Sequence, residues 1–497
     1  MVANINMIKN SKNLITIRKK YKNKIIGLCH GVFDILHFGH IEHFNEAKKN
    51  CDILIVSLTS DEFVKKGPNQ PYNNENKRAA LINSLKIIDY VYINKNLTAI
   101  EIFKYLKPNI YFKGKDYIEK DFTNNLNKEI KELKKYKGKF FLTRTDLMSS
   151  SHILNSNVIN WDKNQLKILK IIKEQSSFRN INKIFEVISK QEITIIGEPI
   201  IDKYTYCEVF GKATKDPTLS LIKKDTYNFS GGVISIAQIL SKFYKKVNLI
   251  TIGKIENLKK FFIKFPNIKI ISVGNEKIQE KERFINEGRL QRLVQIANYK
   301  NIQIDKKVTT KILKYINKLK ARDIIVADFG IGLFSKFTIK SLENLKKNFY
   351  INVQTNSLNM GLNLFTKYKK FKYMSLDLKE WQIGFQLQNP EEKIIEKKIS
   401  KLSCHKSITL GNKGSIYYDK NKKYYSPVFI KDVIDTTGCG DAYFAITSML
   451  ISQKNINKQL IPFLGNVYAG MHSRYLGNSN ITEKTEYLKY INSLSKI

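Results

Sequence analysis

Short apolar runs alternate with amphipathic stretches along the first third of the chain. Five runs have the length and apolar character of buried strands, at 24–30, 52–58, 87–93, 109–114 and 139–143. The stretches between them carry apolar residues at helical spacing, at 41–50, 74–85, 100–106 and 128–138. Strands that alternate with helices predict a mostly parallel sheet with helices packed on it. We therefore expect a first α/β domain over residues 1–156.

A second alternating pattern follows a polar segment. Residues 157–190 have helical spacing and no strand pattern, which predicts a helical connector. Strand-like runs then return at 192–198, 246–253, 323–330, 349–355, 372–377 and 407–414, with helical stretches between them. The segment 284–298 alternates around Gly288 as a hairpin does, and predicts a small β lid. We expect a second α/β domain over residues 191–497, again with a mostly parallel sheet.

The length of the chain agrees with two domains, because 497 residues exceed what one hydrophobic core usually supports. No apolar run approaches the roughly 18 residues that cross a bilayer, and the first residues lack the apolar segment of a signal peptide. The five cysteines are scattered without a CxxC pair, which favours reduced thiols over a disulfide framework or a zinc site. We expect a cytoplasmic protein without a membrane partner.

The net charge of +41 is the most unusual feature of the composition. Such a charge often indicates binding to nucleic acid. Here the basic residues are mostly lysines spread over the whole length, and isoleucine and asparagine are abundant, as in proteins encoded by AT-rich genomes. No arginine-rich tract or interleaved aromatic pattern marks a groove. We favour a compositional origin and expect no nucleic-acid partner, although the charge will attract anionic substrates.

Two histidines follow the first predicted strand, within the sequence GVFDILHFGHIEHF. His37 and His40 are separated by two residues on a loop that enters a helix. This spacing can place both imidazoles beside the α- and β-phosphates of a nucleotide, where the amides at the helix start add positive potential. Gly39 lets the backbone approach the nucleotide closely. Such a site suits nucleotidyl transfer with release of pyrophosphate, and a structural role for the two histidines is the alternative.

This motif resembles the G-x-F-D-x-x-H-x-G-H pattern of the cytidylyltransferase-like nucleotidyltransferase superfamily, through Gly31, Phe33, Asp34, His37, Gly39 and His40. The resemblance implies a Rossmann-like domain that binds ATP or CTP, with the choice of nucleotide left open. It also implies that basic residues neutralise the triphosphate and that a late serine opens a phosphate-binding helix; the matching residues are Lys66, Arg78, Lys113 and Ser150. Lys113 would act with the two histidines in catalysis. For Lys66, a solvent-facing position is the alternative.

A small-residue loop lies near the other end of the chain, in the sequence DTTGCGD. Gly438, Cys439 and Gly440 precede Asp441, which opens an apolar helical stretch. The backbone N–H groups of such a loop at a helix start can form an anion hole. A carboxylate at its end is placed to accept the proton of an attacking hydroxyl. The combination predicts phosphoryl transfer from a nucleotide to a hydroxyl group.

The loop resembles the D-T-x-G-A-G-D signature of ribokinase/PfkB carbohydrate kinases, with Cys439 in place of alanine. The resemblance implies a ribokinase-like α/β fold and Mg-ATP as the phosphoryl donor, with Asp441 as the base. It assigns sugar binding to Asp202, Gly231 and Gly232, magnesium to Asp377 and Glu380, and the ATP side to Gly411, Gly414, Asp435, Gly438, Cys439 and Gly440. Asp328 either lines the acceptor site or caps a strand end.

Two positions depart from this kinase signature. The asparagine that usually follows the di-glycine is missing from GGVISIA, where Ser235 stands nearby, and this leaves the sugar unassigned. Asp377 takes the first position of the N-x-x-E motif. An aspartate there keeps an oxygen ligand but adds a negative charge near magnesium.

Together the two resemblances cover nearly all of the chain. The combination is similar to the bifunctional heptose-phosphate kinases and heptose-1-phosphate adenylyltransferases of lipopolysaccharide precursor synthesis, with the domain order reversed. It implies phosphorylation of a heptose-like sugar or sugar phosphate and transfer of a nucleotide to a sugar 1-phosphate, in a homodimer. Two alternatives stay open. In one, only the first domain is active and transfers cytidylyl to an alcohol phosphate, beside a kinase-fold binding or dimerisation module. The other is a nucleic-acid-binding protein.

Overall fold

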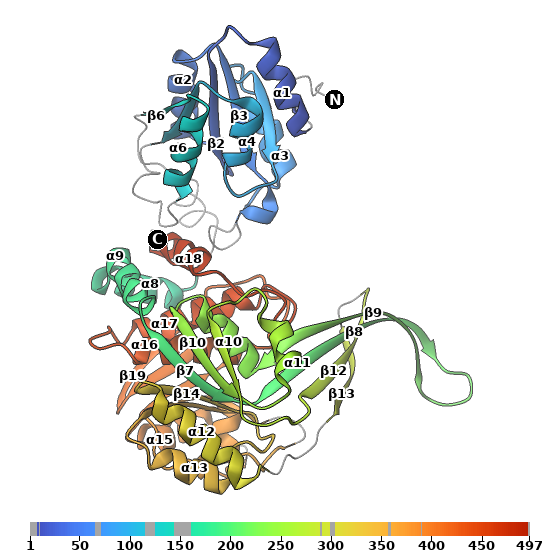
Figure 1. Cartoon of the computed structure of the whole chain (residues 1–497), viewed down its shortest axis with the longest axis vertical. Coiled ribbons are helices and arrows are strands. Elements are labelled where there is room, and N and C mark those ends of the chain that lie inside the picture. Colours follow the sequence, from blue (N-terminus) through green and yellow to red (C-terminus); the bar gives the residue numbers. More distant parts are fainter. Residues whose placement is uncertain are drawn as a thin grey trace. The chain divides into compact units, whose positions relative to one another are not determined.

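The computed structural model describes residues 7–8, 10–64, 71–114, 125–143, 161–288, 291–298, 304–355, 359–388 and 390–495. The chain divides into two compact units (Figure 1). The first unit comprises Met1–Asp162 with Thr485–Ile497, and the second comprises Lys163–Lys484. Every helix in the described ranges is too short or too polar to cross a lipid bilayer.

The first unit is built on a six-stranded parallel sheet. Its strands are β1 (Met7–Ile8), β2 (Ile26–Gly31), β3 (Ile53–Thr59), β4 (Tyr90–Asn94), β5 (Ile110–Gly114) and β6 (Lys139–Thr143). They lie in the order β1-β4-β3-β2-β5-β6, and all neighbours pair in parallel. The helices are α1 (Ser11–Lys20), α2 (Phe38–Lys49), the short η1 (Asp61–Phe63), α3 (Glu75–Asn83), α4 (Ile100–Leu106) and α6 (Asn125–Lys135).

Neighbouring residues of each strand face opposite sides of this sheet and form two cores. On one side, Leu28 of β2 shares a buried cluster with Phe103 of α4, and α1 and α6 contribute to the same cluster. On the other side, Cys29 of β2 packs in a second cluster with Phe44 of α2 and Ile82 of α3. Helices therefore cover both faces of the sheet.

The α/β fold predicted for this unit is confirmed, and each predicted strand and helix is present within a few residues. Strand β1 and helix α1 were not predicted from the sequence. Strand β1 is only 2 residues long. Helix α1 is polar and strongly basic at its end, and it buries only Leu14 and Ile17, so its apolar pattern is weak.

The second unit begins with α8 (Lys163–Gln175) and α9 (Phe178–Ile188), which lie within the segment expected to be a helical connector. The domain boundaries themselves stay a prediction. The remaining helices are α10 (Val233–Ser241), α11 (Ile255–Lys259), η3 (Lys260–Phe262), α12 (Lys306–Lys318), α13 (Lys336–Glu343), η4 (Phe365–Lys367), α14 (Leu378–Gly384), α15 (Glu392–Ser400), η5 (Gly411–Lys413), α16 (Cys439–Ile451) and α17 (Leu460–His472). Helix α18 (Lys484–Leu494) follows α17 in the chain.

A nine-stranded sheet forms the centre of the second unit. Its strands are β7 (Glu192–Gly197), β10 (Lys246–Thr251), β11 (Ile268–Ser272), β14 (Asp323–Asp328), β15 (Asn348–Val353), β16 (Tyr373–Asp377), β17 (His405–Thr409), β18 (Ser415–Asp419) and β19 (Lys422–Ser426). Their order is β11-β10-β7-β14-β15-β16-β17-β18-β19. Only the last two pairings, β17 with β18 and β18 with β19, are antiparallel. The prediction of a mostly parallel sheet is confirmed.

A separate four-stranded sheet, which we call the lid sheet, has the order β13-β12-β8-β9. Its strands are β8 (Pro199–Lys212), β9 (Leu219–Gly232), β12 (Gln279–Asn286) and β13 (Gln291–Asn298). The hairpin predicted over 284–298 is confirmed, because β12 and β13 pair antiparallel. The lid sheet is larger than predicted, since β8 and β9 form a long hairpin whose tip extends well beyond the rest of the unit (Figure 1).

Candidate active sites

The first candidate site lies where β2 leads into α2. His37 is the N-cap of α2, and its carbonyl oxygen accepts a hydrogen bond from the His40 N–H at 2.9 Å. The two imidazole rings stack with centroids 3.8 Å apart and planes inclined by 26°. Gly39, which lies between the two histidines in the sequence, is buried in the first turn of α2. The structure therefore brings the two predicted histidines together at a helix start.

Three further predicted residues lie at the end of β2 and in the loop that follows it. A Cβ on Gly31 would lie 3.0 Å from the ring of Phe33, so a larger residue would displace this ring. Phe33 has a φ of 47°, in the left-handed region that bulky residues rarely adopt. Asp34 accepts hydrogen bonds from the N–H groups of Tyr72 and Asn73, at 2.7 and 2.9 Å. Its carboxylate thus fastens the segment before α3 to this loop.

Lys113 lies on β5, beside β2 in the sheet. Its side chain is buried, and Nζ donates a hydrogen bond to the carbonyl oxygen of His30 at 2.8 Å. The order of the strands changes direction between β2 and β5. Open α/β sheets bind ligands at the carboxyl ends of the strands at such a point. Lys113 and the two histidines therefore lie on the strands and loop that flank the expected ligand crevice.

Arg78 of α3 is fully buried, and its guanidinium is used within the protein. It donates hydrogen bonds to the carbonyl oxygens of Val32 at 2.6 Å, Thr59 at 2.9 Å and Asn73 at 3.0 Å. Nη2 also forms an ion pair with Asp61 at 2.6 Å. A contact with a triphosphate would require the side chain to leave these partners, and the expected role of Arg78 stays a prediction. Two other expected ligands of the triphosphate lie outside the described residues, Lys66 and Ser150.

Replacing Arg78 by lysine should lower the free energy of unfolding of the first unit by about 3 kcal/mol, because an ammonium cannot supply the guanidinium's fixed fork of donors. Hydrogen-exchange protection of β2 and β3 in the full chain measures this loss. Arg18→Lys is the matched control, since Arg18 makes one side-chain hydrogen bond, to Asn109 at 2.9 Å. The control should lose about 1 kcal/mol or less. Equal losses in the two variants would contradict a structural role for Arg78.

The second candidate site is a cavity of about 110 Å³ beside the lid sheet. Its walls come from the lid sheet, from the segments after β14 and β15, from the loop before α16 with the first turn of that helix, and from Asn478. Five residues singled out from the sequence meet there, namely Asp202, Gly232, Gly438, Gly440 and Asp441. The structure thus joins the expected sugar-binding segment and the expected anion-hole loop in one site.

Asp441 lies in the first turn of α16, a helix that is buried throughout from this residue to Ile451. The N-cap, Gly438, has a φ of 81°, and a Cβ there would lie 2.4 Å from Oδ1 of Asn478. Only glycine fits this position. A Cβ on Gly440 would meet nothing within 4 Å, so the loop is open on that side. The helix start therefore presents a carboxylate and an accessible stretch of backbone to the same cavity.

Burial raises the pKa of the Asp441 carboxyl to about 7, and the carboxylate of Asp202 adds to the rise. Lys281 and a hydrogen bond from Nε2 of Gln354 act in the opposite direction. A general base is most effective when its pKa lies near the working pH. Asp441 therefore has the environment of a group that accepts a proton near neutral pH.

Asp202, on β8, forms a buried ion pair with Arg283 of β12, in which Nη1 and Oδ1 are 2.5 Å apart. The two predicted glycines of β9 pack against this region. A Cβ on Gly231 would lie 2.4 Å from Oδ2 of Asp202, and a Cβ on Gly232 would lie 2.6 Å from the carbonyl oxygen of Glu198. Gly231 therefore makes room for the Asp202 carboxylate, and Gly232 lets β9 approach the backbone of Glu198.

Asp435 holds the loop before α16 in place. Its carboxylate accepts hydrogen bonds from the hydroxyl of Tyr204 at 2.9 Å and from the N–H groups of Gly477 at 2.9 Å and Thr437 at 3.0 Å. Arg292 of β13 forms an ion pair with the same carboxylate at 2.5 Å. These contacts join the lid sheet to the loop before α16. The role towards ATP that was expected for Asp435 stays a prediction.

Comparison with known proteins agrees with this geometry. Residues 28–156 match the cytidylyltransferase-like family, and residues 341–466 match the pfkB family of carbohydrate kinases. The chain carries a nucleotidyltransferase domain and a carbohydrate kinase domain. Below, these are called the nucleotidyltransferase domain and the kinase domain.

Curated relatives match the N-terminal part of the chain. The Bifunctional protein HldE of Campylobacter jejuni strain RM1221 is 43% identical over 115 residues, which are 23% of this chain and 25% of that protein. The Bifunctional protein HldE of Aliarcobacter butzleri is 40% identical over 119 residues, again 23% and 25% of the two chains. The chain thus spans about a quarter of the length of these relatives.

Solved structures of several kinases are similar to this chain over about three fifths of its length. The phosphofructokinase-2 of Escherichia coli in complex with potassium has a TM-score of 0.49 and 12% identity, over 61% of this chain and 99% of that chain. The nucleoside kinase of Methanocaldococcus jannaschii has a TM-score of 0.45 and 16% identity, over 62% of this chain and 99% of that chain. At these values the assignment of the kinase domain rests on the pfkB match.

Asp377 and Glu380 form a capping box at the start of α14. The Glu380 N–H donates to Oδ1 of Asp377 at 2.6 Å, and the Asp377 N–H donates to Oε2 of Glu380 at 2.9 Å. The other oxygen of Glu380 accepts the N–H of Thr355 at 3.0 Å. Burial raises the pKa of Glu380 to about 8, and the negative charges of Asp377 and Asp441 add to the rise.

Asp377 and Glu380, the residues expected to hold magnesium, offer carboxylate oxygens, which are ligands that suit this ion. The negative charges of Asp377 and Asp441 disfavour ionisation of Glu380, and a cation held by Asp377 and Glu380 would offset this repulsion. No group of three or more His, Cys, Asp or Glu side chains in the described ranges is arranged to hold a metal ion by itself. Mg²⁺ in kinases is held by one or two carboxylates together with phosphate oxygens, so two carboxylates are sufficient.

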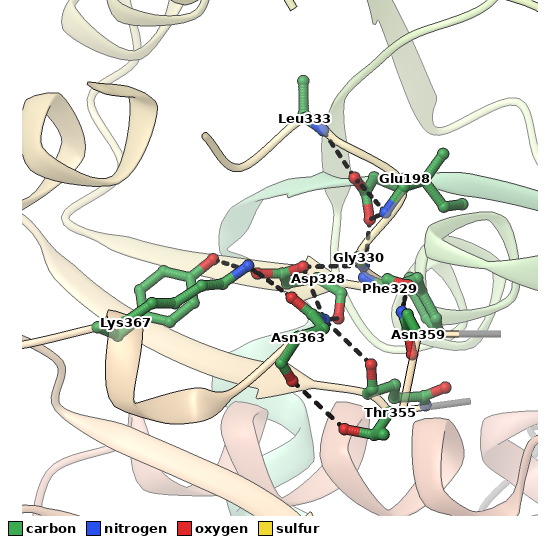
Figure 2. A network of polar contacts seen from close by, with 12 residues as sticks. Glu198, Asp328, Phe329, Gly330, Leu333, Thr355, Asn359, Asn363 and Lys367 are labelled. Carbon is green, nitrogen blue, oxygen red and sulfur yellow. Dashed lines mark hydrogen bonds and ion pairs between the residues drawn. The ribbon is translucent and has the colours of Figure 1, made fainter. Parts of the chain in front are cut away.

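Glu198, labelled in Figure 2, connects β7 to the lid sheet and is fully buried. Its carboxylate accepts hydrogen bonds from the N–H groups of Phe329 at 2.8 Å, Ile331 at 3.1 Å and Leu333 at 2.7 Å. Burial raises its pKa to about 7, and the neighbouring Asp328 adds to the rise. Glu198 therefore fixes the loop after β14, in which Phe329 lines the cavity.

Asp328, at the end of β14, is fully buried as well. Its carboxylate accepts the Tyr368 hydroxyl at 2.7 Å and the Gly330 N–H at 3.0 Å, and it pairs with the ammonium of Lys367 at 2.6 Å (Figure 2). Asp328 is not among the residues that line the described cavity. This arrangement agrees with the strand-end alternative, and the acceptor role stays a prediction.

Three residues expected on the ATP side have structural contacts of their own. The thiol of Cys439 donates to the carbonyl oxygen of Ala469 at 3.4 Å, and burial raises its pKa to about 12. Gly411 and Gly414 have φ angles of 59° and 94° at the two ends of the turn between β17 and β18. A Cβ on Gly414 would lie 2.1 Å from the carbonyl oxygen of Ser426. Both glycines shape this turn, and their role towards ATP stays a prediction.

The sequence reading missed several side chains of the cavity, above all Lys281, Arg283 and Gln354. Lys281 and Arg283 are two residues apart on β12, so alternation along the predicted hairpin could have placed both on one face. Gln354 follows the end of β15, where side chains of parallel sheets meet ligands. In a chain with 85 lysines and arginines, the Lys281 and Arg283 pair does not stand out from the composition.

Proposed function

We propose that this chain is a bifunctional enzyme of nucleotide-sugar synthesis. The kinase domain would phosphorylate a heptose-like sugar or sugar phosphate with ATP. The nucleotidyltransferase domain would couple a sugar 1-phosphate to a nucleotide from ATP or CTP and release pyrophosphate. The observation that carries the proposal is the buried Asp441 at the open helix start, which lines one cavity together with Asp202.

In the kinase step, the hydroxyl oxygen of the acceptor attacks the γ-phosphorus of ATP while the bond to ADP breaks. Asp441 accepts the hydroxyl proton, and backbone amides from Gly438 to Gly440 stabilise the transferring group. Asp202 would hold acceptor hydroxyls at the lid side. Asp377 and Glu380 would hold Mg²⁺, which neutralises phosphate charge when bound with ATP.

In the nucleotidyl step, a phosphate oxygen of the sugar 1-phosphate attacks the α-phosphorus of the nucleotide and pyrophosphate leaves. His37 and His40, stacked at the start of α2, would stabilise the charge that develops on the phosphates. Lys113 would act from β5 at the same crevice. The order of the domains would then be the reverse of the bifunctional enzymes that the chain resembles.

We further propose a homodimer in the cytoplasm. Large apolar side chains are exposed on the lid sheet, including Phe210, Tyr227, Val294 and Ile296. Such side chains favour burial against a second protein surface.

A product assay on the full chain tests the proposal. Purified protein is incubated with Mg-ATP, CTP and a panel of heptose and hexose phosphates, and ADP and pyrophosphate are followed separately. We expect ADP with one acceptor and pyrophosphate with the corresponding sugar 1-phosphate. Neither product with any combination would contradict the proposal.

A second candidate keeps only the nucleotidyltransferase domain active, with cytidylyl transfer to an alcohol phosphate, and the kinase domain would serve as a binding or dimerisation module. Ser235, which stands near the place of the missing asparagine, is fully buried in α10 and is not among the residues that line the described cavity. The acceptor side thus lacks one expected polar contact. Pyrophosphate without ADP from any sugar would favour this candidate.

A further inference from the structure

Gln354 is a polar side chain of the kinase cavity that the functions above do not use. It follows β15, and its Nε2 donates a hydrogen bond to Oδ1 of Asp441. A side-chain amide can donate to a carboxylate without competing for its proton. This contact occupies one of the two carboxylate oxygens and leaves the other, Oδ2, as the acceptor.

The backbone of Gln354 is held by hydrogen bonds to Asp328 and Asn363, both labelled in Figure 2. Its N–H donates to the carbonyl oxygen of Asp328 at 2.8 Å, and its own carbonyl oxygen accepts Nδ2 of Asn363 at 3.0 Å. Oδ1 of Asn363 in turn accepts the ammonium of Lys367 at 2.6 Å. The next residue, Thr355, donates its N–H to Glu380 at 3.0 Å. Gln354 therefore has a fixed position relative to the start of α14 and the end of β14.

We propose that Gln354 is a positioning residue for the kinase step, which holds the Asp441 carboxylate so that Oδ2 faces the acceptor hydroxyl. The inference rests on the proposed kinase function. In the step, the acceptor O–H bond breaks as the new O–P bond forms, the proton moves to Oδ2 of Asp441, and ADP leaves with the electron pair of the broken P–O bond. Gln354 neither gains nor loses a proton.

The groups around Asp441 explain why a neutral donor is useful there. The charges of Asp202 and Lys281 act on the pKa of Asp441. The charge of Asp441 in turn raises the pKa of Glu380 and of the Cys439 thiol. Burial and Asp202 favour the protonated carboxyl, whereas Lys281 and the Gln354 amide favour the carboxylate. The amide therefore helps to keep Asp441 ionised and fixes its orientation, without adding a charge that would bind the phosphates.

Gln354→Met removes the donor and keeps the volume. Because a hydrogen bond to a carboxylate favours the ionised form, its loss should move the acid limb of the kcat profile for ADP formation upward by about one pH unit. The loss of kcat at pH 7 should then be about fivefold greater than the loss at pH 9. Gln354→Glu, which adds a like charge beside Asp441, should shift the limb further in the same direction.

Gln459→Met is the matched control, since Gln459 is a buried glutamine that donates to the carbonyl oxygen of Tyr425 at 2.7 Å and is not among the cavity residues. Its pH profile should equal that of the unmodified protein. Thermal unfolding of each variant shows whether it is folded. A profile of Gln354→Met that is unshifted, or lowered equally at all pH values, would overturn the proposal.

A second readout does not need an acceptor. Carbodiimide attacks protonated carboxyl groups, so the labelling of Asp441, read by mass spectrometry across pH, reports its protonation. The labelling midpoint should rise by about one pH unit in Gln354→Met. An unchanged midpoint would overturn the role of Gln354. If the unmodified protein makes no ADP from any sugar, the proposed kinase function fails, and the labelling still shows whether Gln354 controls the protonation of Asp441.

Discussion

Replacing Asp441 by asparagine should reduce ADP formation by the kinase domain about a thousandfold, because an amide cannot accept the hydroxyl proton. The KM for ATP should change little, since the amides of the anion-hole loop are retained. In the unmodified protein, ADP formation should fall as the pH drops through about 7, where burial places the pKa of Asp441 and the base becomes protonated. Steady-state kinetics from pH 5.5 to 9.5, at saturating ATP, measure both effects.

Asp419→Asn is a suitable control for this experiment. Asp419 lies at the end of β18, pairs with His405 at 3.2 Å, and is not among the residues that line the cavity. The control should keep ADP formation, and Asp441→Asn should keep pyrophosphate formation by the other domain. Full ADP formation by Asp441→Asn would exclude Asp441 as the base.

Replacing His40 by alanine should reduce pyrophosphate formation about 100- to 1000-fold, the range seen when one stabilising donor is removed from a charged transition state. Because the His37 and His40 rings stack, both imidazoles lie beside the same phosphate position in the proposed step. We therefore expect that His37 alone cannot stabilise the developing negative charge to the same extent. Pyrophosphate release with ATP or CTP and a sugar 1-phosphate measures the loss.

The control for His40 lies in the other domain. His405→Ala removes an imidazole that begins β17 and pairs with Asp419 at the end of β18, so it should leave pyrophosphate formation unchanged. ADP formation should be unchanged in His40→Ala. If His40→Ala retained pyrophosphate formation and only lowered stability, the two histidines would have the structural role that the sequence left as an alternative.

The sheets could be predicted from the sequence because their strands are short apolar runs that are buried on both faces. β2 and β3 are examples, with nearly every residue buried. The β8–β9 hairpin could not be predicted in the same way. In its middle, β9 exposes Lys223, Lys224 and Asp225, so the sequence there has the polarity of a loop. Its strand structure comes from pairing with β8 and not from an apolar pattern.

The candidate sites were predictable where a motif is contiguous. Both histidines and Asp441 lie in short segments whose spacing alone indicates the chemistry. Lys281 comes from β12 and Gln354 from the segment after β15, and only the folded domain places them against Asp441. The spacing of Asp377 and Glu380 is also the pattern of a capping box, in which an acidic residue stands three positions after an N-cap aspartate. The same pattern in the sequence therefore fits both a metal site and a helix start.

In the proposed kinase step, the position of Glu198 would separate selection of the acceptor from access to the cavity. Glu198 precedes Pro199, the first residue of β8, and is tied by three backbone N–H groups to the loop after β14. The lid sheet is thus anchored at its root, where Ile200 pairs with Gly231 and Asp202 with Phe229. A bending lid would move its distant tip most and this root least. In the proposed kinase step, the wall that includes Asp202 would then stay rigid, so substrate choice would persist while the entrance opens and closes.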